Sequence, residues 1–177
     1  MGDPKKPRKK FSRPRTPWRA DLLAQELYLV GTYGLRNKRE LWKAQTLLSK
    51  IRKQARTLLA APPEIRAKRE ATLLTSLANK NLVSKDATLD DVLSLTVENI
   101  LGRRLQTLVW KKGLASAPYQ ARQLITHRHI VIGDKIVTKP SYLVSADEEP
   151  KVGFRADSPY KARITPLPTT SISEESE

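Results

Sequence analysis

The stretch 121-ARQLITHRHIVIGDKIV-137 changes its periodicity halfway along, and this change decides the fold class. In its first half, Ala121, Leu124 and Ile125 fall on one face of a helix. In its second half, β-branched residues flank Gly133, which favours a hairpin with Gly133 at the first position of a type II′ turn. A helix that runs directly into a hairpin predicts an α+β protein with a short antiparallel sheet.

Upstream of this stretch the pattern is helical. From Asp21 to Val30 the leucines favour a first helix, and from Pro63 a later helix begins, with Glu64 in its first turn. Between them, apolar residues recur every three or four positions, which predicts a long helix with one buried face. The residues of this seam are Leu41, Ala44, Leu48, Ile51, Ala55 and Leu58. The opposite face carries the cations Arg39, Lys43, Lys50 and Lys53.

The segment 96–113 has the pattern of one continuous helix. Leu101, Leu105, Leu108 and Val109 share one side of it, and Arg103, Arg104, Thr107 and Lys111 occupy another face. Further on, SYLVS at 141–145 predicts a third short strand.

Four segments follow from these patterns. Residues 1–19 hold eight Lys or Arg and four Pro with few apolar side chains, so we expect a disordered basic arm that orders on a partner. Residues 20–100 are expected to form a mainly helical domain. Residues 101–165 are expected to form a helix–helix–hairpin module, and 166–177 a flexible acidic tail.

Charge is concentrated in two blocks. The chain has 177 residues, a net charge of +15 and a pI near 10.2. Residues 1–60 carry 16 basic and 4 acidic groups, and 101–145 carry 8 and 1, whereas 61–100 carry 5 and 6. Such a field favours polyanions, either nucleic acid or an anionic membrane face, although a generally solvated basic surface gives the same counts.

Several classes of protein are disfavoured. No stretch reaches the about 18 apolar residues of a membrane span, and the first 20 residues carry charges rather than an apolar signal core, so we expect a soluble, intracellular protein without a membrane role. The absence of cysteine excludes disulfides, thiol catalysis and cysteine-bearing zinc sites. No nucleophile motif, Gly-rich phosphate loop or paired-carboxylate spacing is present. We therefore expect no catalytic residues, metal, cofactor or small-molecule substrate.

His127 and His129 admit several interpretations. Two rings at a helix-to-strand change have no reason to converge on one metal, and a third His is missing. A ribonuclease pair would need a cleft and a positioned cation. One ring, with His129 favoured, fits a structural role against the hairpin. Contact with RNA by at least His127 is the interpretation that we favour.

Two blocks together resemble a known family. YGLRNKRELW at 33–42, followed by the basic helix, and RRLQTLVWKKGLASAPYQARQLITHRHIVIGDKIVTKPSYLV at 103–144 resemble the S-four family of small-subunit ribosomal proteins, in its archaeal and eukaryotic branch. The likeness covers about residues 14–165. It implies a structural, non-enzymatic protein of the cytoplasmic ribosome that binds small-subunit ribosomal RNA directly and early, at a junction of helices in the 5′ region. It also implies contact with a neighbouring small-subunit protein and a position near the path by which mRNA enters the ribosome. Through this position the protein would influence decoding accuracy.

The resemblance and the two basic faces together give a set of residues expected to contact RNA. Tyr119 is included because an exposed aromatic ring can stack on a base. The set is Arg36, Asn37, Lys38, Arg39, Lys43, Lys50, Lys53, Arg103, Arg104, Lys111, Tyr119, Arg122, Gln123, Thr126, His127, Arg128, His129 and Lys135.

The chain departs from the family pattern at Arg128, where many members have Gly. A left-handed backbone there would cost Arg roughly 1 kcal/mol relative to Gly. Two other functions remain open at this point: an RNA-modifying enzyme or fragment that carries the same module, and an accessory or recycling factor that uses it to bind large subunits.

Overall fold

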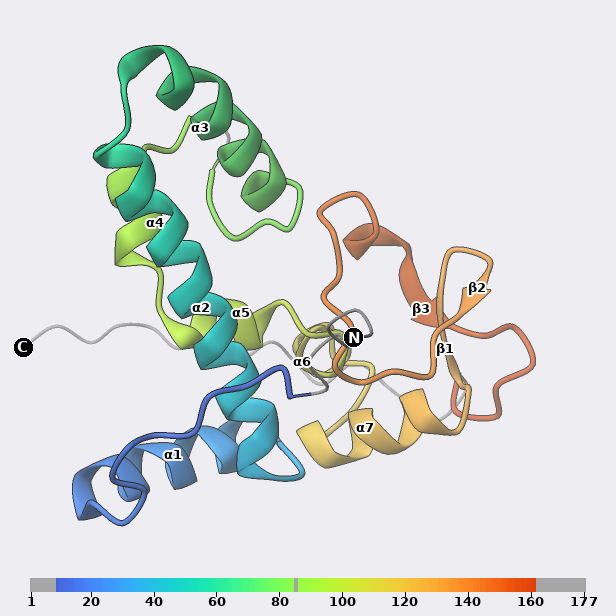
Figure 1. Cartoon of the computed structure of the whole chain (residues 1–177). Helices are drawn as coiled ribbons and strands as arrows, with labels where there is room; N and C mark the ends of the chain where they lie inside the picture. Colours follow the sequence, from blue (N-terminus) through green and yellow to red (C-terminus); the bar gives the residue numbers. More distant parts are fainter. Residues whose placement is uncertain (1–8, 85, 162–177) are drawn as a thin grey trace, which may run out of the picture.

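The computed structural model describes residues 9–84 and 86–161. The predicted tail at 166–177 and the first eight residues of the predicted arm lie outside the described residues. The α+β class is confirmed: seven α-helices and a small sheet make up the described part of the chain (Figure 1).

The first part of the fold is helical and is built around one long helix. Helices α1 (Ala20–Thr32), α3 (Pro63–Ala78), α4 (Leu89–Ser94) and α5 (Val97–Gly102) all pack on α2 (Lys38–Leu59). The predicted seam of α2 is confirmed, because all six of its apolar residues are buried. Asn37 caps this helix by accepting a hydrogen bond from the Glu40 N–H.

The second part is the helix–helix–hairpin unit. Helix α6 (Leu105–Lys111) packs on α7 (Pro118–Thr126), and three short antiparallel strands follow, β1 (Ile130–Ile132), β2 (Lys135–Ile136) and β3 (Val152–Phe154), with a 3-10 turn at Glu149–Lys151. The strand order is β2-β1-β3. The predicted turn is confirmed: Ile132 pairs with Lys135, and Gly133 has φ +58°.

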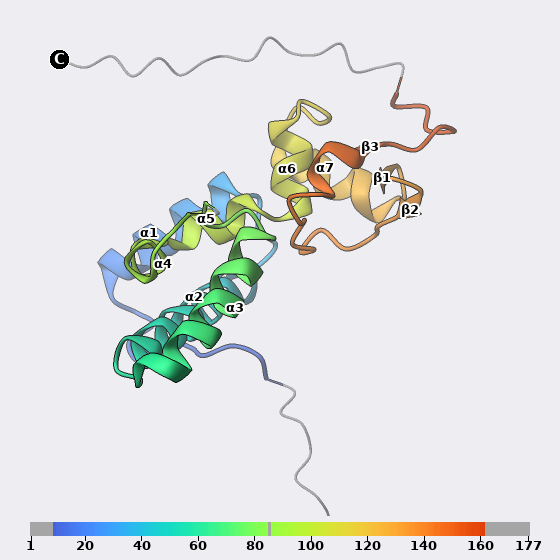
Figure 2. The same ribbon diagram turned by 90° about the horizontal axis from the view of Figure 1, so that it is seen from above.

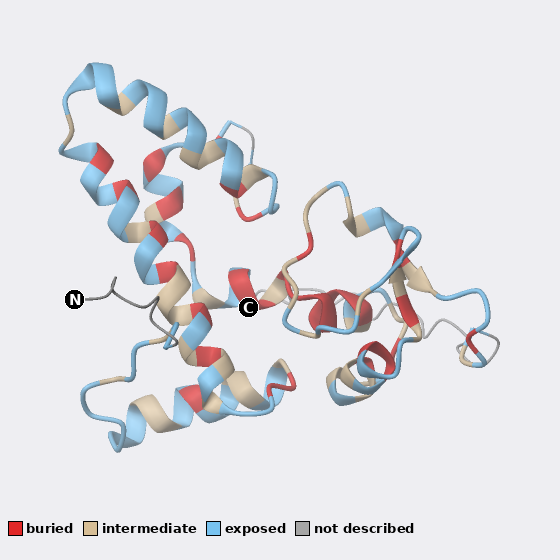
Figure 3. Cartoon of the chain, turned by 45° about the vertical axis from the view of Figure 1, so that its right-hand side comes forward, coloured by how far each residue is buried: buried red, intermediate tan, exposed pale blue. Residues whose placement is uncertain are grey.

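Each part has its own apolar core. Leu35, Leu41 and Leu101 belong to the first cluster, and Leu105, Ile125 and Val144 belong to the second. In Figure 3 the buried residues follow the inner sides of the helices, whereas much of α3 and the outer side of α2 is exposed. The buried residues of the first cluster end at Leu101, and those of the second begin at Leu105. This boundary lies where α5 ends and α6 begins.

The prediction of one continuous helix over 96–113 is wrong. It is broken at Arg103 and Arg104, and the backbone of Arg104 is extended. The segment around 140–144 causes the break, because the N–H groups of Leu105 and Gln106 donate to carbonyls of that segment instead of to the preceding helical turn. Tertiary hydrogen bonds therefore override the helical period.

The prediction of a third strand at 141–145 is also wrong. This segment forms only an isolated bridge between Leu143 and Arg104. The third strand is Val152–Phe154, which pairs with β1 and completes the sheet. The segment 141–145 is used at the junction of the two parts, where Val144 N–H donates to the Arg103 carbonyl.

Candidate nucleic-acid interface

The predicted cationic face of α2 is exposed. Arg39, Lys43, Lys50 and Lys53 all project to solvent, as do Arg36 and Asn37 in the turn that precedes the helix. Lys38 differs, because its ammonium lies 3.1 Å from the buried carboxylate of Glu26. Lys38 is therefore partly used within the fold, and the remaining cations of this turn and helix face are accessible to a polyanion.

The described end of the basic arm lies on the same face of α2. Phe11 stacks on Trp42 with ring centroids 6.0 Å apart, and the Ser12 N–H donates to Thr46 Oγ1 over 3.0 Å. Arg13 lies over the Trp42 ring and Arg39 over the Phe11 ring, at 5.9 and 5.7 Å from the centroids. The arm thus brings further cations to the surface formed by α2.

Arg103 and Arg104 do not face outward, so the expectation that they share an exposed face is wrong. Their exposed fractions are 9% and 5%. Arg103 pairs with Glu149 at 2.8 Å, and Arg104 pairs with Glu40 at 2.6 Å. Thr107 is also buried, and its hydroxyl donates to the Leu101 carbonyl. The break between α5 and α6 turns these side chains inward, where they join the two parts of the fold.

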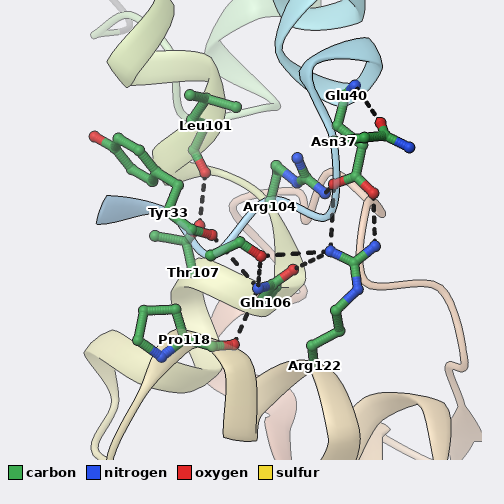
Figure 4. Close-up of polar contacts among 10 residues, drawn as sticks. Tyr33, Asn37, Glu40, Leu101, Arg104, Gln106, Thr107, Pro118 and Arg122 are labelled. Atoms are coloured by element: carbon green, nitrogen blue, oxygen red, sulfur yellow. Dashed lines mark hydrogen bonds and ion pairs between the residues drawn. The ribbon is translucent and has the colours of Figure 1, made fainter. Parts of the chain in front are cut away.

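Glu40 is the centre of a polar cluster between the two parts (Figure 4). Its carboxylate accepts hydrogen bonds from Arg104 and, over 2.6 Å, from Nη2 of Arg122. Burial alone would raise the pKa of Glu40, but the hydrogen bonds and charges of Arg122 and Arg104 outweigh burial and hold that pKa below its ordinary value. Glu40 is therefore ionised at neutral pH and links α2 to α7.

Gln106 extends this cluster beneath Arg122. Its amide nitrogen donates to the carbonyls of Gly34 and Pro118, each over 2.9 Å, and its amide oxygen accepts from Arg122. Gly34, with φ +57°, is packed so closely that an added Cβ would lie 2.7 Å from Pro118 Cβ. The turn before α2, the start of α7 and helix α6 are thereby held in one arrangement.

The outer side of α7 and the hairpin form a second exposed surface. Tyr119, Gln123, Thr126, His127, Arg128 and Lys135 are exposed, as is Lys111 at the end of α6. Arg122 is half-buried because of its bonds to Glu40. The structure thus leaves most of the residues predicted in the second block exposed. Arg103 and Arg104 are buried, and Lys111 points toward Gly102 of α5 rather than toward α7.

The two histidines have different surroundings. His127 is exposed at the end of α7. His129 is half-buried: Ser158 Oγ lies 3.2 Å from its Nδ1, and the Tyr160 ring packs edge-on at 4.8 Å between centroids. Arg128 between them has φ +64°, the left-handed conformation that the family's Gly suggests. No group of three or more metal-ligating side chains occurs among the residues described.

Sequence reasoning missed two contributors to this arrangement. Glu40 looks like an ordinary first-turn acid of α2, and no local pattern shows that it meets Arg122. Arg69 is an exposed cation on α3 that lies near Lys50 and Lys53 of α2, and a helical projection of 63–78 alone cannot show this proximity.

An α+β chain with a helix–helix–hairpin unit and two exposed basic surfaces has the charge of a protein that binds polyanions. Two family patterns match: "Ribosomal protein S4/S9 N-terminal domain" over residues 5–102, and "S4 domain" over 103–149. The chain belongs to the uS4 family of small ribosomal subunit proteins. Its members are structural, rRNA-binding components of the translation machinery and are not enzymes, which decides against the RNA-modifying enzyme.

Individual relatives agree over nearly the whole chain. "Small ribosomal subunit protein uS4" of Hyperthermus butylicus is 56% identical over 163 residues, which is 92% of this chain and 93% of the relative. The protein of the same name from Ignicoccus hospitalis is 56% identical over 160 residues, 90% of this chain and 96% of the relative. The resemblance found in the sequence is thus confirmed. Among the described residues, no helix is long and apolar enough to cross a membrane.

Proposed function

We propose that the chain binds small-subunit ribosomal RNA directly and organises its 5′ region as the subunit assembles in the cytoplasm. One observation carries the proposal: the Glu40 cluster holds two exposed cationic surfaces, that of α2 and that of α7 with the hairpin, in one fixed arrangement. A rigid body with two basic faces suits a junction, because it can fix the angle between RNA helices without a large ordering entropy.

The residues that we propose to contact RNA are those of the predicted set whose side chains are exposed. RNA is recognised largely through phosphates, 2′-hydroxyls and unstacked bases, for which arginine forks and aromatic rings are suited. Tyr119, with 54% of its surface exposed, is the stacking candidate. The exposed set is Arg36, Asn37, Arg39, Lys43, Lys50, Lys53, Lys111, Tyr119, Gln123, Thr126, His127, Arg128 and Lys135.

A domain boundary near 100 fits this proposal, since the buried residues of the first apolar core end at Leu101 and those of the second begin at Leu105. A boundary near 19 fits the start of α1 at Ala20, and the proposed boundary at 165 lies outside the described residues. Contact with a neighbouring small-subunit protein is supported by apolar side chains that solvent reaches at α1. Trp18, Leu27 and Tyr28 are 87%, 55% and 69% exposed. Proximity to the path of mRNA, and an effect on decoding accuracy, are further proposals that rest on the family resemblance.

Sedimentation of a cell lysate tests the proposed function. At low salt the chain should travel with small subunits, and rising salt should release isolated chain from RNA steeply, because each neutralised phosphate releases counterions. Recovery with large subunits instead would favour the accessory or recycling factor. Failure to sediment with either subunit would contradict a ribosomal role.

A further inference from the structure

Helices α2 and α3 lie side by side (Figure 2). Residues of both helices line an open groove. The groove has a volume of about 670 Å³, within the range of sites that hold small ligands or single residues of a polymer. Lys50 and Lys53 line it from α2, and Arg69 lines it from α3. Cations therefore stand on both walls, and no carboxylate is among the lining residues.

These three cations are available to a ligand. Lys50, Lys53 and Arg69 are exposed, and none of them takes part in the ion pairs found among the described residues. Arg66 in the same helix is different, because it pairs with Glu70 at 3.1 Å. An anionic chain lying along the groove would thus meet positive charge on each side without displacing an internal partner.

Two threonine hydroxyl groups that line the groove can accept hydrogen bonds from a ligand. Thr57 Oγ1 donates its proton to the Lys53 carbonyl over 2.9 Å, and Thr72 Oγ1 donates to the Lys68 carbonyl over 3.0 Å. Because each hydroxyl has one proton, both present lone pairs to a groove ligand. A phosphate oxygen cannot donate to them, but a ribose 2′-hydroxyl can, and deoxyribose lacks that group.

The floor of the groove is apolar. Leu58 is buried and Leu73 is half-buried, and both are among the lining residues. A sugar or the face of a base can cover the part of Leu73 that solvent reaches, whereas a free phosphate would leave that part in water. The cations suit the phosphates of a single RNA strand, the acceptor hydroxyls suit its 2′-hydroxyls, and the apolar floor suits its sugars or bases.

We propose that the groove between α2 and α3 holds one strand of RNA, with phosphates at Lys50, Lys53 and Arg69. A 2′-hydroxyl of the strand donates to Thr57 or Thr72, and the sugars or bases lie on the leucines. This inference rests on the proposed function and adds a particular site and a preference for ribose. An acidic polypeptide would meet the same cations, and the experiment separates the two ligands.

The first test uses the full chain and a fluorescein-labelled oligouridine of about eight nucleotides, a length typical of single-strand sites. Arg69→Glu should weaken binding about fivefold, and Lys68→Glu, an exposed neighbour outside the groove, should weaken it less than about twofold. Arg69→Lys should retain most of the affinity. Equal losses for Arg69→Glu and Lys68→Glu in folded proteins would overturn the site.

The second test concerns the sugar. Wild type should bind oligouridine more tightly than oligodeoxyuridine of the same length, and the double variant Thr57→Val, Thr72→Val should lose this preference while its affinity for the DNA stays the same. A preference that survives in the double variant would overturn the role of the hydroxyls. Polyglutamate of matched charge should displace the oligouridine poorly, and displacement equal to that by unlabelled oligouridine would overturn RNA as the occupant.

Binding to full-length small-subunit ribosomal RNA, measured in parallel, separates the two proposals. If wild type binds this RNA and the groove variants behave like Lys68→Glu, the groove proposal alone is wrong. If wild type does not bind it, the proposed function is wrong as well.

Discussion

Glu40 and Arg122 are 82 positions apart in the chain, and a hydrogen bond of 2.6 Å joins Oε1 of the former to Nη2 of the latter. The same carboxylate pairs with Arg104. One acidic side chain on α2 therefore compensates two arginines of the helix–helix–hairpin unit, and it fixes the distance between the two exposed cationic surfaces on which the proposed RNA binding depends.

Glu40→Gln should destabilise the fold. The substitution leaves the charges of Arg104 and Arg122 without a carboxylate in a site where Arg104 has only 6% of its side chain exposed, and loss of one partner of such a buried pair costs about 3 kcal/mol. Urea unfolding at pH 7 measures the difference. Glu64→Gln, an exposed acid in the first turn of α3, is the control and should cost less than about 1 kcal/mol.

The pH dependence of unfolding gives a second readout of the same substitution. Because the folded-state pKa of Glu40 is lowered, its stabilisation is fully present above the unfolded-state value of about 4.3 and is lost as the pH falls through the folded-state pKa. The difference in unfolding free energy between wild type and Glu40→Gln should therefore shrink on acidification below about pH 4. A difference independent of pH would contradict the charge pairing.

Gly34→Ala should also destabilise the junction. A Cβ at this position would lie 2.7 Å from Pro118 Cβ and 2.9 Å from the amide nitrogen of Gln106, and φ is +57°. Left-handed strain and overpacking together cost about 2 kcal/mol or more. Gly31→Ala is the matched control, since nothing lies within 4 Å of its Cβ and it lies within α1. Thermal unfolding should show a lower midpoint for the first and an equal or higher midpoint for the second.

How far the sequence predicts the fold differs between elements. The seam of α2 is local, so its period alone identified every buried residue from Leu41 to Leu58. The hairpin was likewise predictable, because the turn at Gly133 depends on the residue itself. The break between Arg103 and Arg104 was not, since it depends on backbone hydrogen bonds from a segment about forty residues away, for which the local pattern carries no signal.

The candidate surfaces show the same division. The exposure of Lys43, Lys50 and Lys53 follows from their place on a helix with one buried face. The polar face of α7 also gave the direction of Arg122, but a helical projection states only which way a side chain points and not what lies across from it. Glu40 occupies that position, so Arg122 became a link within the fold.

Arg128→Gly should raise stability and lower RNA affinity at once. Its φ of +64° disfavours Arg relative to Gly by roughly 1 kcal/mol, whereas its exposed guanidinium is a proposed phosphate contact. Urea unfolding should show the gain, and a salt titration of RNA binding should show a shallower dependence, with one fewer phosphate neutralised. Lower stability together with unchanged RNA binding would contradict both assignments.

The two histidines should separate in the same assays. His127→Ala removes an exposed ring and should weaken RNA binding modestly while the unfolding midpoint stays the same. His129→Ala removes the contacts with Ser158 and Tyr160 and should lower the free energy of unfolding by about 1–3 kcal/mol. A loss of stability in His127→Ala together with a loss of RNA binding in His129→Ala would contradict the prediction.

Crosslinking of the chain to total cellular RNA, followed by identification of the crosslinked nucleotides, tests the central proposal most directly. Crosslinks from peptides of α2 and α7 should fall on different helices around one junction in the 5′ region of small-subunit ribosomal RNA. Crosslinks that fall mainly on large-subunit ribosomal RNA or transfer RNA would contradict the proposal.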